Sequence, residues 1–256
     1  MNQTIETIHS LRTVHGDFSD REITQTDLDE ILSASVKAAN ASARQSYSII
    51  LLEDRERMKE LFGYQGSRAL IYCVDFTRLK MAAEHLGHKF DEDDIIGFIT
   101  SSMDVMLAAQ TAVIAAKSLG IDSLITNGLH RKNLGEIYAS LHLPDTSCFP
   151  LISVVLGYPN REPSIHKGRL SLDHVVHQDH YQVPSNEKLS RLISEYDDPN
   201  RHLGMIDNWE QQGFKHYLDW FFTKWCDEPV SNKVATGKVL EFQQRLRKSG
   251  FWWPEE

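Results

Sequence analysis

The sequence is poor in cysteine. Its 256 residues include three cysteines, Cys73, Cys148 and Cys226, which lie far apart. An odd and scattered set does not fit the disulfide framework of a small secreted domain and suits a reducing compartment. The first twelve residues, MNQTIETIHSLR, lack the apolar core of a secretory signal. We therefore expect a soluble cytoplasmic protein.

Positive charge is also scarce. Lys and Arg number 27 against 36 Asp and Glu, which gives a formal net charge of -9. A general nucleic-acid binder needs excess basic side chains to displace counterions, so we expect no nucleic-acid partner, although local basic pockets remain possible. The composition, 41% hydrophobic and 25% charged, is that of an ordinary globular protein. The length allows one large domain, or a domain with an appendage.

Several common site motifs are absent as well. There is no Walker loop, no G-x-G-x-x-G and no G-x-S-x-G, and the cysteines lack a recognisable catalytic setting. The spacing of His174, His177 and His180 raises the question of a metal, but no Cys or carboxylate pattern completes a ligand set. Val175 and Val176 favour a short strand, which would turn neighbouring histidines to different faces. We expect no metal.

One long apolar run dominates what is present. Residues 95–119 read IIGFITSSMDVMLAAQTAVIAAKSL, apolar around most of a helix, and such a helix must be covered on most sides. The run exceeds the roughly 18 residues of a membrane span. However, Asp104, Gln110 and Lys117 interrupt it and no cluster of Lys or Arg flanks it. We predict a buried central helix, long enough to be shared between two subunits, and a polar loop at 124–129.

Shorter elements surround this helix. Periodicity and capping predict helices at 1–10, from an N-cap at Thr24 to Ala39, at 55–62 and at 132–141, and strands at 47–52, 69–74 and 149–156. From about Tyr181 the chain becomes charged and helical. Few strands separated by helices indicate an α+β fold, with helices on both sides of a sheet.

Two short basic elements are candidates for a phosphate site. Arg12, followed by Thr13 and His15, offers a planar fork with additional donors. Lys167 and Arg169 flank a glycine, which permits close approach of the backbone. Each element taken alone is more typical of a solvated surface turn than of a binding site.

Aromatic residues crowd the segment 209–225. Phe214, Tyr217, Phe221 and Trp225 recur at helical spacing, which favours packing against a neighbouring element. The alternative is a lid over a flat ligand, with Lys224 reaching the substrate.

Six segments follow one another over residues 8–181 without large gaps. They are LRTVHGDFSDREI, NASARQSYSII, GYQGSRALIYCVDFTR, MLAAQTAVIAAKSLGIDSLITNGL, FPLISVVLGYPNREPSIHKGRL and HVVHQDHY. In this order they resemble the FMN-dependent nitroreductase family, especially its NADPH-dependent, oxygen-insensitive branch. The resemblance implies a central mixed or antiparallel sheet flanked by helices, in an intertwined homodimer. Residues 1–181 would form the FMN-binding domain, and 182–256 a helical C-terminal extension packed on the partner subunit.

The resemblance also assigns residues to the cofactor. Arg12, Thr13 and His15 would bind the phosphate and ribityl end of FMN, with Lys167 and Arg169 closing the phosphate site; His15 stands where the family usually has a second Arg. The residues expected around the flavin ring are Ser42, Arg44, Gln45, Gln65, Asn127, Gly128 and Leu129. The branch usually carries Gly-Gly where this chain has Asn127-Gly128. No catalytic side chain is expected, because the flavin carries the chemistry.

The implied activity is transfer of a hydride from NAD(P)H, through FMN, to an electrophilic acceptor such as a nitroaromatic or a quinone, in a ping-pong cycle. The expected partners are a small-molecule acceptor and a second copy of the chain, with no membrane. A rival interpretation is a flavin-binding or flavin-sequestering homodimer with little turnover, if Asn127 and the aromatic tail block the ring. A third is a protein–protein scaffold that has lost flavin.

Overall fold

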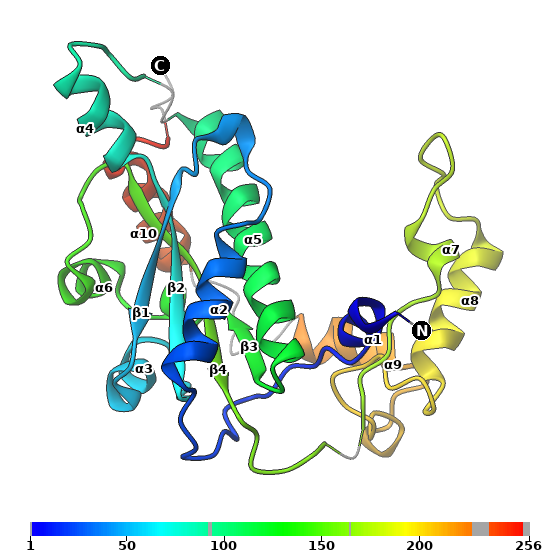
Figure 1. The fold of residues 1–256 in the computed structure, drawn as a ribbon. Helices are drawn as coiled ribbons and strands as arrows, with labels where there is room; N and C mark the ends of the chain where they lie inside the picture. The colour runs from blue at the N-terminus through cyan, green and yellow to red at the C-terminus, as the bar shows by residue number, and fades with distance from the viewer. Residues whose placement is uncertain (1, 92–93, 164, 227–235, 253–256) are drawn as a thin grey trace. The chain divides into compact units, whose positions relative to one another are not determined.

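The fold is described from a computed structural model, which covers residues 2–91, 94–163, 165–226 and 236–252. The chain forms two compact units (Figure 1). Unit 1 combines Met1–Arg161 with Thr236–Glu256, and unit 2 is Glu162–Ala235. The boundary predicted at residue 181 separates an FMN-binding region from an extension that packs on a partner chain. It is defined by binding and not by compactness, so it stays a prediction.

Unit 1 is built on a four-stranded antiparallel sheet with the order β1-β2-β4-β3. The strands are β1 Tyr47–Leu52, β2 Arg68–Asp75, β3 Asp122–Thr126 and β4 Cys148–Gly157. β2 is buried along seven of its eight residues, because helices cover both faces of the sheet. A strand buried on both faces reads as a continuous apolar run, which is the signal that predicted it. The predicted α+β fold is thus confirmed.

β3 was not predicted. The sequence indicated a loop over 124–129, which is wrong for residues 124–126. The strand has the sequence DSLIT, and its polar ends give little strand signal. Its conformation depends on pairing with β4, from Asp122 opposite Gly157 to Thr126 opposite Ser153. After the strand, Gly128–Arg131 form a 3-10 turn, η2.

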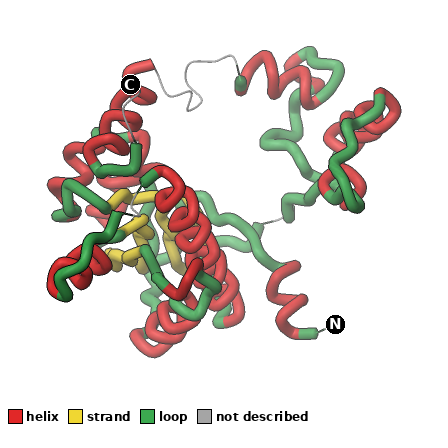
Figure 2. Tube along the Cα trace, turned by 90° about the horizontal axis from the view of Figure 1, so that it is seen from above, coloured by secondary structure: helices red, strands yellow, loops and turns green. Residues whose placement is uncertain are grey.

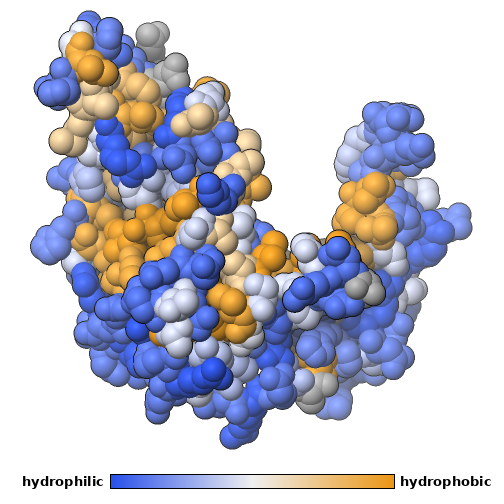
Figure 3. All heavy atoms as spheres, viewed as in Figure 1, coloured by the Kyte–Doolittle hydropathy of each residue, from blue (hydrophilic) through white to orange (hydrophobic). Residues whose placement is uncertain are grey.

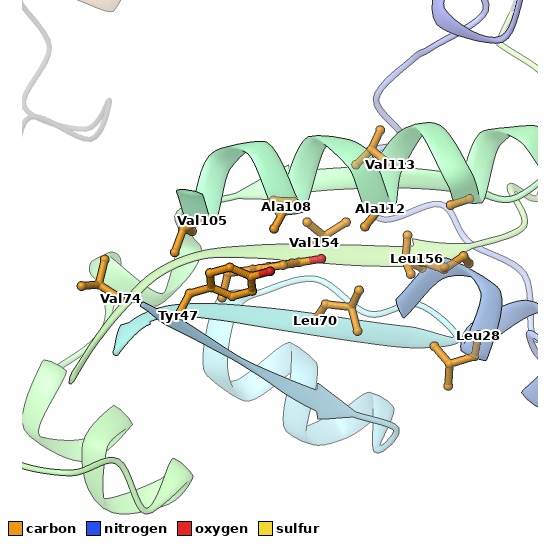
Figure 4. Close-up of a cluster of buried hydrophobic side chains, with 14 of the residues drawn as sticks. Leu28, Tyr47, Leu70, Val74, Val105, Ala108, Ala112, Val113, Val154 and Leu156 are labelled. Carbon is orange, nitrogen blue, oxygen red and sulfur yellow. The ribbon is translucent and has the colours of Figure 1, made fainter. Parts of the chain in front are cut away.

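The central helix α5, Ile95–Ser118, covers one face of the sheet together with α2, Gln25–Ser35. Its prediction over 95–119 is confirmed. Figure 4 shows Val105, Ala108 and Ala112 pointing toward the strands, where the small alanines permit a close approach. Among the described residues, α5 is also the one helix long and apolar enough to cross a membrane. Its packed face is part of the main core, as expected for the central helix of a globular unit.

Other helices complete unit 1, and Figure 2 shows the strands lying between helices. They are α1 Gln3–His9, α3 Arg55–Phe62, α4 Thr77–His85, α6 Leu134–Leu141 and α10 Thr236–Lys248. α3 and η2 lie over the second core cluster, on the sheet face opposite α5. The C-terminal segment returns to the main core, where Phe251 is fully buried against Phe76 and Phe98.

Unit 2 has a small aromatic core of its own. Its elements are α7 Leu172–Val175, α8 Asn186–Asp197, η3 Glu210–Gln212, α9 Tyr217–Trp220 and a π-helical turn, η4 Phe221–Trp225. Tyr217 is buried and stacks on Tyr196, with ring centroids 5.4 Å apart, and its ring also contacts those of Trp220 and Phe221. This packing supports the first interpretation of the aromatic segment. The short strand expected at 175–176 is wrong, because α7 ends at Val175.

Candidate flavin site

Arg12 is fixed by a buried carboxylate. Its Nε and Nη2 atoms donate to Oδ2 of Asp122 at 3.0 and 2.5 Å, and Lys117 Nζ donates to Oδ1 at 2.7 Å. Burial alone would raise the pKa of Asp122, but the hydrogen bonds and charges of Arg12 and Lys117 lower it. Two cations therefore share one carboxylate at the start of β3. Sequence reasoning missed Asp122, since 110 residues separate it from Arg12.

The segment after Arg12 runs beside the edge strand β3. Thr13 forms a parallel bridge with Ser123, and the N–H of Val14 donates to the Ser123 carbonyl at 3.0 Å. Val14 is buried, whereas Thr13 and His15 are exposed. The alternation of an extended chain therefore presents the two predicted phosphate-binding side chains to solvent.

Gln65 lies in a turn held against this segment. The ring of Tyr64 is 6.4 Å from that of His15, and a Cβ added at Gly16 would lie 3.2 Å from Tyr64. The Oε1 atom of Gln65 is buried and has no hydrogen-bond partner among the described residues. A buried acceptor left unpaired is costly, so its position fits a donor supplied by a ligand. An unpaired amide oxygen of this kind can accept from a ligand N–H, which is the role that the family resemblance predicts for Gln65.

The predicted ring-contacting trio has three different environments. Asn127 is exposed. The N–H of Gly128 donates to Thr126 Oγ1 at 3.1 Å, and a Cβ at this position would lie 2.4 Å from the Phe62 carbonyl oxygen. Leu129 is buried in the second core cluster. Packing thus accounts for Gly128 and Leu129, and Asn127 is the member of the trio that solvent reaches.

The loop at 41–45 has an unusual backbone. Ser42, Ala43 and Gln45 have φ angles of 54°, 53° and 47°, in the left-handed region that side chains other than glycine rarely adopt. Asp104, buried in α5, accepts the N–H of Ala41 at 2.9 Å. Such strain persists where the surroundings impose it and is common at ligand sites. The predicted contacts Ser42, Arg44 and Gln45 lie on this imposed loop.

The structure does not bring all the unit 1 candidates together within one chain. The 41–45 loop is attached to α5 at Asp104, whereas Arg12 is attached near Lys117 through Asp122. These two positions are 13 residues apart on the helix, which is about 20 Å at 1.5 Å per residue. Arg12, Thr13, His15 and Gln65 form one group, and the 41–45 loop forms another.

In unit 2, the other basic element is held by backbone contacts. Lys167 Nζ donates to the Gly204 carbonyl at 2.6 Å, and the N–H of Gly168 donates to the Arg201 carbonyl at 3.1 Å. A Cβ at Gly168 would lie 2.2 Å from that carbonyl oxygen, so glycine is required there. Arg169 is exposed, as is Lys224 in η4. The close approach at Gly168 fixes the loop that carries both cations.

One described cluster combines a histidine with two carboxylates, a ligand set that the spacing of His174, His177 and His180 did not indicate. Ligand atoms of Asp173, His174 and Glu195 lie within 4.8 Å of one another. However, Glu195 forms an ion pair with Arg201 at 3.0 Å, and Asp173 lies 3.9 Å from Arg191. Each carboxylate thus already faces an arginine.

Known reductases resemble this chain over most of its length. No family model matches the sequence. The chain is 31% identical over 234 residues, 85% of this chain and 92% of the relative, to "FMN reductase [NAD(P)H]" of Bacillus subtilis. It is 30% identical, over 77% of this chain and 81% of the relative, to "Oxygen-insensitive NADPH nitroreductase" of Salmonella typhimurium.

A solved structure shows the same fold over the whole chain. NfrA2 of B. megaterium is 26% identical and superposes with a TM-score of 0.79, covering 100% of both chains. The antiparallel sheet order, the central helix and the sequence identity over most of both chains lead to one conclusion: the protein belongs to the FMN-dependent nitroreductase family.

Proposed function

We propose that this enzyme, an FMN-dependent NAD(P)H oxidoreductase, delivers electrons to a small electrophilic acceptor such as a nitroaromatic or a quinone. The observation that carries the proposal is the unpaired, buried Oε1 atom of Gln65, in the turn whose Tyr64 ring lies 6.4 Å from the ring of the exposed His15. The relatives' names, FMN reductase and NADPH nitroreductase, support the same chemistry. When bound, FMN takes a hydride from NAD(P)H and passes two electrons to the second substrate.

The chain's own contribution is to bind and orient the flavin. Arg12 and Lys117, both held by Asp122, place two cations close to the Thr13 segment, which favours a phosphate beside the Thr13 hydroxyl. Gln65 Oε1 would accept from the pyrimidine edge. From the family resemblance, Lys167 and Arg169 are proposed as further cations for the phosphate. Asn127 would face the ring, whereas Gly128 and Leu129 shape the turn that carries it.

The second group of ring contacts comes from another copy of the chain. Ser42, Arg44 and Gln45 lie on a loop attached about 20 Å along α5 from the attachment of Arg12, which supports a role for this loop at the flavin of a partner chain. Arg44 then places positive charge near the pyrimidine of the partner's flavin. We therefore propose a homodimer with an FMN site at each end of the shared interface.

An exposed apolar stripe on α5 supports this assembly. Ile96 and Met103 are 66% and 59% exposed, and Ile99, Met106 and Leu107 continue the same side of the helix. Each lies three or four residues from the one before it or from Met103, which keeps all five on one face of the helix. Large exposed patches of this kind mark interaction sites in soluble proteins. Hydrophobic side chains also gather over the sheet beside this helix on the face drawn in Figure 3.

NAD(P)H and the acceptor occupy the site in turn, since both must approach the same ring. Lys224, exposed in η4, is proposed to attract the nucleotide or an anionic group of the acceptor.

The three cysteines are free thiols, which fits a reducing cytoplasmic location.

The visible spectrum of the purified protein tests the function. A yellow protein that is bleached anaerobically by NADPH or NADH, and recoloured by a nitroaromatic or a quinone, is the expected result. A colourless protein that FMN cannot reconstitute would overturn the proposal. A yellow protein that neither nucleotide bleaches would identify a flavin-sequestering protein instead.

A further inference from the structure

Glu22 carries a concentrated set of polar contacts in unit 1 that the cofactor assignments leave unused. Its Oε1 atom accepts from Arg55 Nη2 at 2.8 Å, and its Oε2 atom accepts from Arg68 Nη1 at 2.5 Å. The hydroxyl of Ser67 donates to the same Oε2 atom at 2.7 Å. Burial alone would raise the pKa of Glu22, but these hydrogen bonds lower it to about 2. The carboxylate therefore stays charged at neutral pH.

The contact with Ser67 connects Glu22 to the turn that carries Gln65. Ser67 is fully buried, and its Oγ atom also accepts the N–H of Ile23 at 2.8 Å. Its own N–H donates to the Leu156 carbonyl at 2.8 Å. Ser67 is thus fixed between the 22–23 segment and β4, two residues after Gln65.

The turn has little room to shift between its two ends. A Cβ added at Gly66 would lie 2.5 Å from the Leu156 carbonyl oxygen, so the backbone of this residue is pressed against β4. On the other side, a Cβ added at Gly16 would lie 3.2 Å from the Tyr64 ring. The Gln65 side chain therefore takes its direction from a backbone held at Tyr64, Gly66 and Ser67.

Packing does not explain the cluster at Glu22. The Glu22 side chain is 53% exposed, and its segment is already anchored by the buried side chains of Phe18 and Ile23. The N–H of Ser19 also donates to the Tyr158 carbonyl at 2.7 Å. A neutral side chain at position 22 would leave these anchors intact. It would weaken the hydrogen bond that position 22 accepts from the Ser67 hydroxyl.

We infer that Glu22 is a positioning residue of the flavin site, which acts through Ser67 to aim the Gln65 side chain at the flavin pyrimidine. The inference rests on the proposed binding of FMN at Gln65. Two arginines, Arg55 and Arg68, fix the carboxylate from both sides, so its oxygen reaches Ser67 in one orientation. Glu22 itself does not contact the flavin.

The test compares Glu22→Gln with Glu53→Gln in the full-length protein. Glu53 pairs with the same Arg68, at 3.2 Å from Nε, is similarly exposed, and makes no described contact with Ser67. Loss of a hydrogen bond to a charged group commonly changes an equilibrium about tenfold. We expect the Kd for FMN to rise about tenfold in Glu22→Gln, with a shifted absorption maximum of bound FMN. Glu53→Gln should stay within about twofold of the unsubstituted protein.

A double-mutant cycle with Gln65→Ala separates positioning from general destabilisation. If Glu22 acts through Gln65, adding Glu22→Gln to Gln65→Ala should weaken FMN binding by less than about twofold. A full second loss would overturn the inference, as would an unchanged Kd in Glu22→Gln, even with a lower melting temperature. Failure of the unsubstituted protein to bind FMN would instead overturn the proposed function, and this inference with it.

Discussion

At the scale of single residues, the two charges within the apolar central helix have definite partners. Asp104 accepts the N–H of Ala41, and Lys117 binds Asp122, which in turn holds Arg12. A buried charge is tolerated when it is paired or hydrogen-bonded. Each of the two charges therefore fixes a segment that carries expected cofactor contacts.

Replacing Asp104 should affect both stability and cofactor binding. Asp104→Ala leaves the Ala41 N–H without its acceptor and should cost about 1–3 kcal/mol of unfolding free energy, measured by urea denaturation. Binding of FMN should weaken as well, because the 41–45 loop loses its anchor. Asp94→Ala is the matched control: Asp94 caps the same helix by accepting the Gly97 N–H at 2.8 Å, and should cost about 1 kcal/mol with FMN binding unchanged. Equal FMN binding in both variants would refute the anchoring role.

Glu22 should make the stability depend on acid pH. Its pKa is about 2 in the folded protein and 4.5 in its ordinary environment, so the folded state favours the charged form. The resulting stabilisation is complete above about pH 4.5 and is lost as the pH falls toward 2. Urea denaturation between pH 6 and pH 2.5 should therefore show a shallower decline for Glu22→Gln than for the unsubstituted protein. Parallel declines would show that Glu22 contributes nothing to this dependence.

At the scale of elements, the sequence predicted those whose pattern is local. The helices α3 and α5 and the strand β1 lie where periodicity and composition indicated them. β3 was missed, because its five residues become a strand through pairing with β4. For the same reason, the sequence pointed to Arg12 as a candidate phosphate contact but did not predict its pairing with Asp122. Contacts over 110 residues leave no local pattern.

The turn after β3 offers a test of packing at this scale. Gly128→Ala would place a Cβ 2.4 Å from the Phe62 carbonyl oxygen, so α3 or η2 must move. We expect a loss of about 1–3 kcal/mol in unfolding free energy. Gly135→Ala in α6 is the comparison, since its Cβ would lie 3.1 Å from Asn133 Oδ1. Alanine favours a helix by up to about 1 kcal/mol over glycine, which offsets this milder contact, so the unfolding free energy should change little. Equal stabilities of the two variants would contradict the close approach at Gly128.

At the scale of the whole molecule, the proposed homodimer rests on the apolar stripe of α5, which unit 1 leaves exposed. Light scattering should give about twice the chain mass of 29.3 kDa. Met103→Asp, on the exposed stripe of α5, should shift the protein toward monomer and reduce its FMN content. Met81→Asp is the control, since Met81 is similarly exposed but lies on α4. A mass near 29.3 kDa with FMN still bound would contradict the assembly.

The measurement that tests the two-chain flavin site most directly is complementation between two defective chains. Arg12→Ala and Arg44→Ala should each weaken FMN binding, by about 1.5–3 kcal/mol if each cation binds the flavin. In a heterodimer of the two variants, one site contains both substitutions and the other contains Arg12 and Arg44 intact. A purified heterodimer should therefore bind one FMN per dimer with the affinity of the unsubstituted protein. If both arginines served the same flavin from one chain, every site would carry one substitution, and a heterodimer without any tight site would contradict the account.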